Sequence, residues 1–484
     1  MFEPVIGLEV HVELKTRTKM FCACPVVDST RAEPNTAVCE ICMGLPGSLP
    51  AVNAGAIECA VRVALALGSD VAPVSVFARK NYFYPDLPKG FQISQYESPL
   101  ATGGALSVPG DGQEKRVRIR RVHLEEDTGK LIHRQGESLV DYNRAGVPLL
   151  EVVTEPDLRS VEDAKAFSTE LRSLLRTLDV TTGDMEKGAI RFEANVSIRP
   201  VGVQDFGVRT EIKNLNSFRA MVRAVTFEID RQSRLAAAGM PVDQETRGWD
   251  EVRGETLPQR DKEDAHDYRY FPEPDLPPLR IDETFVERVR RSQPEIPAER
   301  RVRFRQNLGL PPHLAAQLAA DPRIADTFEA AVAAAPTVPP EKFALWITGE
   351  VFGLLNEAGL TVDQSALSPA ALAEIVAMVE GDVISPPTGK SLLQRIFREG
   401  GSPSQIVEAE GLAQVGDVQE IDRLIAEVLA AHPEQVDLYR GGKTAVSQWL
   451  FGQVMRRAGG RAKPSLVAER LSALLSTDQN RRGG

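Results

Sequence analysis

Apolar and polar residues alternate with a period of two in several segments of the first part of the chain. Residues 5–14 place apolar side chains on one face of an extended strand and polar side chains on the other, and residues 190–199 repeat the arrangement. Residues 208–213 continue it. Such alternation is typical of a strand that buries one face. We therefore expect a large antiparallel sheet with one polar face.

Helical patterns interrupt these strands and then replace them. One helix is predicted between Asn53, a suitable N-cap, and Gly68, and another over residues 164–178. Beyond Pro294 and Pro297 the alternation ends, and Ala, Leu and Glu dominate. The chain is therefore expected to be α+β, with a sheet domain followed by helices.

The helical part also contains residues that predict where helices begin and end. Ser368 is predicted to cap a helix that has Pro369 at its first position and Gly381 just past its end. The apolar residues within 421–429 recur at helical spacing, which indicates a packed helix face. The Gly-Gly-Ser-Pro sequence at 400–403 predicts a hinge between two helical domains.

Composition limits the classes of function. The 484 residues are 42% hydrophobic and 26% charged, which is typical of a globular protein with two to four domains. We find neither a run of eighteen apolar residues nor a signal peptide, so a cytoplasmic protein without a membrane span is expected. The net charge of −11 means that any contact with nucleic acid must be local.

Four of the five cysteines form two close pairs. Cys22 and Cys24 are separated by one residue, Cys39 and Cys42 by two, and fourteen residues lie between the pairs. Two short turns that each present two thiolates predict one structural, tetrahedral zinc site. Two reduced pairs without metal, or a redox pair, are the alternatives. Cys59 lies in the predicted helix after Asn53 and is expected in the core.

Carboxylates and histidines recur on the polar strand faces. They occur at alternate positions in residues 9–13 and 123–127, and Glu151 follows an apolar run. Oxygen ligands with one imidazole suit a hard cation such as magnesium and leave room for phosphate oxygens. A solvated sheet face with scattered charge is the alternative, and the spacing alone does not decide between them.

Two stretches imitate phosphate-binding loops. Residues 388–391 and 442–444 carry the G-K-[ST] end of a P-loop, but the leading glycine is missing and no buried strand precedes either one. We reject both, so any use of ATP is expected to proceed without a P-loop.

One segment resembles a known family. Residues 141–151, DYNRAGVPLLE, look like the signature of the B subunit of the aspartyl/glutamyl-tRNA amidotransferases. Five further segments resemble the same family in the same order: residues 6–14 (IGLEVHVEL), 79–86 (RKNYFYPD), 123–127 (HLEED), 211–217 (EIKNLNS) and 267–275 (DYRYFPEPD). Some members of that family keep a cysteine-bound zinc and others have lost it.

The resemblance implies a reaction. The B subunit would use ATP to phosphorylate the side-chain carboxylate of Glu-tRNA(Gln), Asp-tRNA(Asn) or both. Ammonia released from glutamine or asparagine by an amidase-fold A subunit would reach the B subunit through a channel and displace phosphate. A small C subunit would hold the other two together. The carboxylate needs this activation because oxide is a poor leaving group, and phosphoryl transfer needs mainly positioning and charge neutralisation.

The resemblance also implies residue roles. The expected magnesium ligands are Glu9, His11, Glu125 and Glu151, with Glu126 an alternative to Glu125. Lys80 and Lys213 would neutralise phosphate oxygens and, with Glu9, His11 and Glu151, form the catalytic set. Arg191 or Arg269 would pair with the substrate carboxylate. For these two arginines and the two lysines, ion pairs on the sheet face are the alternative. The residues expected to bind ATP or substrate are Arg191, Glu193, Asn195, Glu211, Tyr268 and Arg269.

The domain plan implied by the family has three parts. A cradle-shaped kinase domain with its zinc knuckle would cover residues 1–290, a helical domain residues 291–405, and a helical tail residues 406–484. Residues 440–468 contain six basic residues and no acid, which predicts a tRNA-binding patch on this acidic protein. Its members are Arg440, Lys443, Arg456, Arg457, Arg461 and Lys463. An ordinary solvated helix face is the alternative.

Two other functions compete with this one. In the first alternative, the chain is a tRNA-binding scaffold whose kinase site has decayed. In the second, it is a metal-dependent ligase that acts alone. The retained Glu9, His11, Lys80 and Glu151 speak against the first. The absence of a recognisable ammonia-releasing nucleophile motif speaks against the second.

Overall fold

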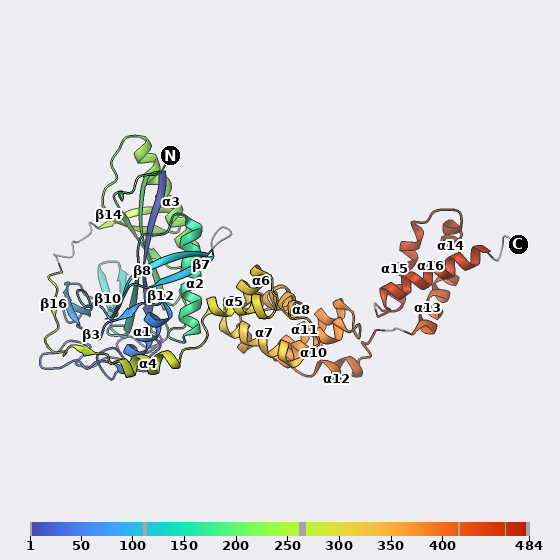
Figure 1. Cartoon of the computed structure of the whole chain (residues 1–484), viewed down its shortest axis with the longest axis horizontal. Helices are drawn as coiled ribbons and strands as arrows, with labels where there is room; N and C mark the ends of the chain where they lie inside the picture. Colours follow the sequence, from blue (N-terminus) through green and yellow to red (C-terminus); the bar gives the residue numbers. More distant parts are fainter. Residues whose placement is uncertain (1, 110–113, 261–267, 415–416, 460, 481–484) are drawn as a thin grey trace. The chain divides into compact units, whose positions relative to one another are not determined.

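The computed structural model describes residues 2–109, 114–260, 268–414, 417–459 and 461–480. The chain divides into two compact units, Met1–Arg300 and Arg301–Gly484. The first unit contains the sheets and the second is helical (Figure 1). The expected α+β class is confirmed.

A ten-stranded sheet forms the centre of the first unit. Its strands lie in the order β15-β14-β13-β12-β1-β11-β8-β6-β2, and β7 pairs with β8 outside this path. The strands are β1 (Phe2–Glu13), β2 (Asp70–Val71), β6 (Ala101–Thr102), β7 (Ala105–Pro109), β8 (Glu114–Glu126), β11 (Pro148–Thr154), β12 (Ile190–Pro200), β13 (Thr210–Leu215), β14 (Glu245–Asp250) and β15 (Glu255–Arg260).

The expectation of a purely antiparallel sheet is wrong at one edge. β13 and β14 pair in parallel, whereas the pairs around β1 are antiparallel. Parallel neighbours need a crossover rather than a hairpin, and helix α3 (Phe218–Ala237) supplies it here. The sheet is therefore mixed.

Helices cover one face of the sheet and leave the other face to the site. The apolar set of β1 packs into a core that α1 (Ala54–Ala66), α2 (Val161–Thr177) and α3 complete. Ile6, Val10 and Val12 have no exposed surface, as the alternation predicted. In Figure 1, α2 and α3 lie beside the long strands. The polar residues of β1 consequently face away from this core.

The predicted caps explain where two of these helices begin. The side chain of Asn53 accepts hydrogen bonds from the backbone N–H groups of Gly55 and Ala56, so α1 begins where expected. Helix α2 begins earlier than predicted, because Ser160 caps it through the N–H of Asp163.

Among its described residues, the first unit also contains three small sheets. β4 (Ala78–Asn81) pairs with β5 (Phe91–Ser94) and with β16 (Phe271–Pro272). β9 (Lys130–Arg134) pairs with β10 (Glu137–Asp141), and β3 (Val74–Ser75) pairs with β17 (Leu279–Arg280). α4 (Glu283–Arg291) packs against α1. The β4 sheet matters for the site because β4 carries Lys80.

The second unit contains two hydrophobic clusters. The first lies within residues 304–407 and the second within residues 421–475. The helices of the first are α5 (Pro297–Asn307), α6 (Pro312–Ala319), α7 (Pro322–Ala334), α8 (Pro340–Trp346), the π-helical turn η1 (Ile347–Val351), α9 (Phe352–Ala358), the 3₁₀ turn η2 (Val362–Gln364), α10 (Pro369–Glu380), α11 (Pro386–Glu399) and α12 (Pro403–Ala409). Those of the second are α13 (Val418–Ala431), α14 (Pro433–Arg440), α15 (Val446–Arg457) and α16 (Pro464–Asn480).

Several sequence predictions are confirmed in this unit. Ser368 caps α10, and Gly381 follows its last residue. Ile421 and Ile425 of α13 are fully buried. Residues 388–391, the first P-loop imitation, lie inside α11.

The predicted boundary at residue 405 falls within a helix. α12 spans it, and Val407 of α12 packs in the first cluster. The first cluster therefore continues past 405, and the three-domain plan stays a prediction. No helix among the described residues is both long and apolar enough to cross a bilayer.

Candidate active site and cysteine cluster

A cavity of about 730 Å³ opens over the polar face of the central sheet. Its lining combines side chains from seven neighbouring strands of that sheet, from β15 to β8 in the sheet order, with Lys80 of β4. Ten predicted site residues line it: Glu9, His11, Lys80, Glu125, Glu151, Arg191, Glu193, Glu211, Lys213 and Tyr268. A solvated face does not describe this arrangement, since Glu125 and Glu151 are only 4% and 7% exposed.

The strand register brings His11, Glu125 and Glu151 together as a first acidic group. His11 lies opposite Glu151 across β1 and β11, and Glu151 lies opposite His123 across β11 and β8. The Nε2 atom of His11 is 3.5 Å from a carboxylate oxygen of Glu125 and 3.5 Å from one of Glu151. Ligand atoms of His11, Glu125 and Glu151 all lie within 4.8 Å of one another. Oxygen and imidazole donors at this spacing fit one hard divalent cation.

Glu126, the alternative to Glu125, lies elsewhere. Its carboxylate accepts a hydrogen bond from the backbone N–H of Ile93 and pairs with Lys89. Successive strand residues point to opposite faces, so only Glu125 reaches the His11 group.

Glu9 belongs to a second acidic group rather than to the first. Ligand atoms of Glu9, Glu193 and Glu211 lie within 4.8 Å of one another. Glu9 lies opposite Glu193 across β1 and β12, and its Oε1 accepts a hydrogen bond of 2.9 Å from the amide of Asn195. The four expected magnesium ligands are thus divided: the side chain of Glu9 lies with carboxylates of β12 and β13, and that of His11 with carboxylates of β11 and β8.

Burial and contacts among its members shift the pKa values in the first acidic group in different directions. Burial lowers the pKa of His11, but its hydrogen bond to Glu151 and the charges of Glu151 and Glu125 outweigh that and raise it to about 9. Burial and the charge of Glu151 raise the pKa of Glu125. Burial opposes ionisation of Glu151, yet His123 and His11 hold its pKa well below the ordinary value. His11 and Glu151 therefore carry opposite charges at the cavity wall.

Two lysines face the acidic groups. The Nζ atom of Lys80 lies 4.7 Å from the ring centroid of Tyr268. Burial lowers its pKa, but Tyr270 and Glu125 raise it above the ordinary value, so Lys80 stays protonated. Lys213 lies 3.3 Å from a carboxylate oxygen of Glu193. These ammonium groups place positive charge beside the carboxylates of the cavity.

The two arginines differ in position. Arg191 lines the cavity and donates a hydrogen bond of 2.8 Å to Asp127. Arg269 is exposed, does not line the cavity, and adopts a left-handed backbone with φ of 46°. Its backbone carbonyl accepts a hydrogen bond from the side chain of Asn81. Of the two candidates for pairing with a substrate carboxylate, the geometry favours Arg191.

Sequence reasoning missed several lining residues. Tyr82 and Tyr84 stack with ring centroids 5.9 Å apart, and Tyr270 also lines the cavity. All three lie in segments already quoted for the family resemblance, which was the only available signal. Asn195, by contrast, lines an adjoining cavity.

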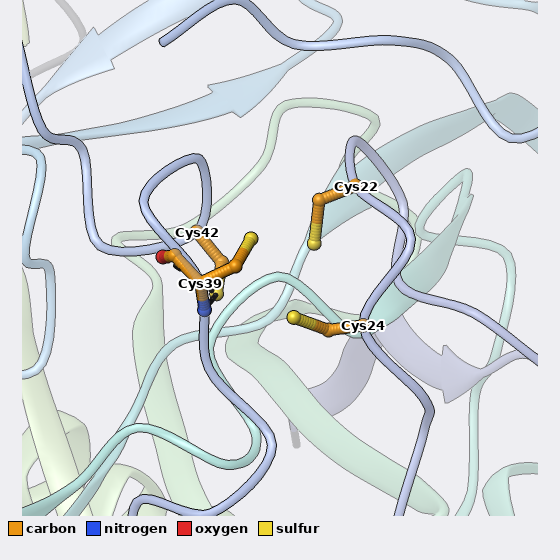
Figure 2. Close-up of side chains that lie close together, drawn as sticks. All are labelled: Cys22, Cys24, Cys39 and Cys42. Atoms are coloured by element: carbon orange, nitrogen blue, oxygen red, sulfur yellow. Dashed lines mark hydrogen bonds between the residues drawn. The ribbon is translucent and has the colours of Figure 1, made fainter.

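The four cysteines converge as predicted. Cys22 and Cys24 come from one loop, Cys39 and Cys42 from another, and their side chains meet (Figure 2). All four sulfur atoms lie within 4.8 Å of one another. In a tetrahedral zinc site with Zn–S bonds of ~2.3 Å, sulfur atoms lie about 3.8 Å apart. The donor set therefore fits zinc with little movement.

The surroundings of this cluster favour one thiolate, that of Cys42. Lys19, which has no exposed surface, places Nζ 3.7 Å from the sulfur of Cys42. The backbone N–H of Cys39 also donates to that sulfur. The Cys22 thiol, the N–H of Cys39 and the Lys19 ammonium together lower the pKa of Cys42 to about 5. Cys59 packs against the core of the first unit, as expected.

Folding neutralises part of the predicted tRNA patch. Arg457 pairs with Glu427, Arg440 with Asp437, and Lys463 with Asp382, at distances of 3.1, 3.4 and 2.6 Å. Arg461 donates to the backbone carbonyl of Gly411. Lys443 and Arg456 are exposed. The acids lie outside residues 440–468, which is why the sequence pattern overstated the local positive charge.

Comparison with known proteins decides the family. A profile of the GatB/GatE catalytic domain matches residues 4–287, more than half of the chain, and a profile of the GatB domain matches residues 326–475. The chain belongs to the GatB family. The resemblance found in the sequence is thereby confirmed.

Relatives in the GatB family match along almost the whole chain. Those of Thermomicrobium roseum, Moorella thermoacetica and Persephonella marina are each named as the B subunit of aspartyl/glutamyl-tRNA(Asn/Gln) amidotransferase. Their identities to this chain are 50%, 48% and 47%. The matches cover 97%, 98% and 98% of this chain and 98%, 100% and 99% of the relatives. The GatB-domain match crosses residue 405, as the first helical cluster does.

Proposed function

We propose that this chain is the B subunit of a glutamine-dependent amidotransferase. It acts on Glu-tRNA(Gln), Asp-tRNA(Asn) or both, and forms Gln-tRNA(Gln) or Asn-tRNA(Asn) at the expense of ATP. The observation that carries the proposal is the single cavity in which two acidic groups face Lys80 and Lys213.

The donor sets indicate which residues would hold magnesium. His11, Glu125 and Glu151 form one set, and Glu9, Glu193 and Glu211 the other. A bound divalent cation would offset the negative charge that carboxylates and phosphates bring into the same cavity. The cysteine cluster would hold structural zinc, because four protein thiolates leave no position for a substrate.

The chain's own residues then position two negatively charged reactants. Arg191 orients the side-chain carboxylate of the aminoacyl group, while Lys80 and Lys213 hold phosphate oxygens. One carboxylate oxygen bonds to the γ-phosphorus as the bond to the ADP oxygen breaks. Ammonia then bonds to the acyl carbon, phosphate leaves with the oxygen that it acquired, and the new amide loses a proton.

The ammonia comes from another polypeptide. The described residues that line the cavity include neither serine nor cysteine, so the site has no such nucleophile to cleave glutamine. An amidase-fold A subunit and a small C subunit are the proposed partners, and the cytoplasm, where tRNA is charged, is the proposed compartment. This also argues against a ligase that acts alone.

The geometry argues against a decayed scaffold. Such a protein would have no reason to keep buried, like-charged carboxylates in register, because they destabilise a fold unless a ligand or cation compensates them. Residues 440–468 are proposed to contact the tRNA, mainly through the exposed Lys443 and Arg456.

The test is ATP hydrolysis by the assembled complex. With the amidase-fold and small partners present, hydrolysis is expected to depend on Glu-tRNA(Gln) or Asp-tRNA(Asn) and to match amide formation one to one. Correctly charged Gln-tRNA(Gln) serves as the control. Hydrolysis that ignores the aminoacyl group would contradict the proposal.

A further inference from the structure

The parallel edge of the central sheet brings two polar side chains together. β14 pairs in parallel with β13, and this register places Thr246 of β14 opposite Glu211 of β13. Both residues line the cavity above the sheet. None of the roles derived above uses Thr246.

The side chains of these two residues are in direct contact. The hydroxyl of Thr246 donates a hydrogen bond of 2.9 Å to Oε2 of Glu211. Thr246 is 7% exposed and Glu211 is 6% exposed. A hydrogen bond to an ionised carboxylate is stronger than one between neutral groups, and burial strengthens it further. The contact therefore restrains the Glu211 carboxylate in one orientation.

Glu211 needs such a restraint because of its neighbours. Its carboxylate belongs to the second acidic group, in which ligand atoms of Glu9, Glu193 and Glu211 lie within 4.8 Å of one another. Carboxylates at this distance repel one another, and a glutamate side chain has several rotatable bonds through which it can turn away. A donor that holds the carboxylate in place keeps the three ligand atoms together before a cation arrives.

The other members of the second acidic group have donors too. The amide of Asn195 donates to Glu9 at 2.9 Å, and the ammonium group of Lys213 lies 3.3 Å from a carboxylate oxygen of Glu193. Thr246 supplies the corresponding donor from β14. A carboxylate has about four acceptor positions, so one donor orients it and leaves positions for a cation.

Contacts on the opposite face of the sheet hold β14 in place. Arg247, the residue after Thr246, donates hydrogen bonds of 2.9 and 2.6 Å to the hydroxyl and the backbone carbonyl of Thr256 on β15. Its guanidinium also lies 3.8 Å from Glu228 of α3, which has no exposed surface. The crossover helix thus fixes the strand that presents Thr246 to the cavity.

We propose that Thr246 is a positioning residue, whose hydroxyl orients Glu211 so that the second acidic group binds one divalent cation. This inference rests on the proposed function, in which that group would hold magnesium. The parallel edge then serves the site, because it brings a hydroxyl of β14 to a carboxylate of β13.

Two variants separate positioning from packing. Thr246→Val keeps the shape of the side chain and removes the hydroxyl, whereas Thr246→Ser keeps the hydroxyl and loses a methyl group. Thr246→Val is expected to raise the apparent dissociation constant for magnesium by about tenfold, as changes to the partners of metal ligands do. Thr246→Ser should keep the wild-type value. The constant is measured on the full chain, without nucleotide, from thermal unfolding at several magnesium concentrations.

Thr256→Val is the matched control. The hydroxyl of Thr256 also donates to a buried carboxylate, that of Glu228 at 3.1 Å, but on the face that α3 covers. Its removal should lower stability equally with and without magnesium. If Thr246→Val behaves in the same way, with an unchanged dissociation constant for magnesium, the inference is overturned.

A double-variant cycle assigns the effect to Glu211. In a Glu211→Gln chain, adding Thr246→Val should change the dissociation constant for magnesium much less than tenfold, because no charged ligand is left for the hydroxyl to orient. A tenfold change in both backgrounds would show that Thr246 acts by another route and would overturn the inference.

Hydrolysis by the assembled complex keeps this inference distinct from the proposed function. The Thr246→Val complex should need about tenfold more magnesium for half-maximal tRNA-dependent ATP hydrolysis and should regain most of its kcat when magnesium is saturating. If the wild type lacks this hydrolysis while Thr246→Val still weakens magnesium binding, the proposed function fails and the positioning role stands. If the wild type hydrolyses ATP as proposed while wild type and variant bind magnesium equally, the positioning role alone fails.

Discussion

Glu9 lies directly opposite Glu193 across the β1–β12 strand pair. Like charges at opposed positions on one sheet face destabilise the pairing, by about 0.2–1 kcal/mol. Glu211 adds a third carboxylate within 4.8 Å. This arrangement lies beneath the cavity where phosphate chemistry is proposed. A bound magnesium ion would offset the repulsion among these carboxylates.

Glu9→Gln is expected to stabilise the metal-free protein slightly and to remove part of its stabilisation by magnesium. The substitution removes a repelling charge but also a cation ligand, and a ligand that binds only the folded state raises its stability. The midpoint of thermal unfolding, measured with and without millimolar magnesium, checks both effects. Glu137→Gln, on an exposed hairpin, is the control. A magnesium response equal to that of the wild type would exclude Glu9 from cation binding.

Glu151→Gln is expected to lower tRNA-dependent ATP hydrolysis at least a hundredfold. Glu151 is 7% exposed and contacts both His11 and His123, at 3.5 and 3.2 Å, so the change removes the charge at the centre of the first acidic group. Glutamine hydrolysis by the amidase-fold partner should persist, since its nucleophile lies on another chain. Parallel assays of both half-reactions check this, and full tRNA-dependent hydrolysis in the variant would remove Glu151 from the mechanism.

Lys19→Met is expected to weaken zinc retention by about 10- to 100-fold without removing a ligand. Four thiolates around one zinc ion leave a net charge of about −2, and the buried ammonium of Lys19, 3.7 Å from Cys42, offsets part of it. The wild type should contain about one zinc per chain, measured by elemental analysis and by competition with a chelator. Lys187→Met, a surface change, is the control. A metal-free wild type from zinc-replete medium would contradict the zinc site.

Neutralising Lys443 and Arg456 together is expected to weaken tRNA binding and to flatten its dependence on salt. Each phosphate contact that is lost should lower the slope of log K against log salt by about 0.7–0.9. Arg457→Gln is the matched comparison and should change the slope less, because Glu427 already pairs with Arg457. Binding isotherms at several salt concentrations check this, and equal slopes for the double variant and the wild type would make the patch ordinary surface.

A truncation tests the same segment more coarsely. A chain that ends after Gln414 keeps Val407, which belongs to the first helical cluster, and loses α13–α16. The carboxylate chemistry should survive at saturating tRNA while the apparent affinity for tRNA falls.

The sequence predicted those parts of the fold that depend on local pattern. The alternation in β1, the caps Asn53 and Ser368, and the convergence of four cysteines follow from strand period, capping chemistry and ligand spacing. Glu125 was preferred to Glu126 on the family resemblance, and the strand geometry places Glu125, rather than Glu126, beside His11.

The rest depended on tertiary relationships that periodicity does not encode. The parallel pairing of β13 with β14 follows from the crossover of α3, and the separation of Glu9 from His11 follows from the strands that happen to lie on either side of β1. Glu427 and Asp382 reach Arg457 and Lys463 only after folding. These contacts join residues that are far apart in the sequence, so local patterns do not reveal them.

The transfer of oxygen tests the central claim most directly. The claim is that the aminoacyl carboxylate attacks the γ-phosphorus of ATP in the cavity above β1. When the side-chain carboxylate of Glu-tRNA(Gln) or Asp-tRNA(Asn) is labelled with ¹⁸O, phosphate released by the assembled complex should carry one labelled oxygen for each amide formed. The Glu151→Gln complex should release no such phosphate. Unlabelled phosphate accompanying full amide formation by the wild type would contradict the account.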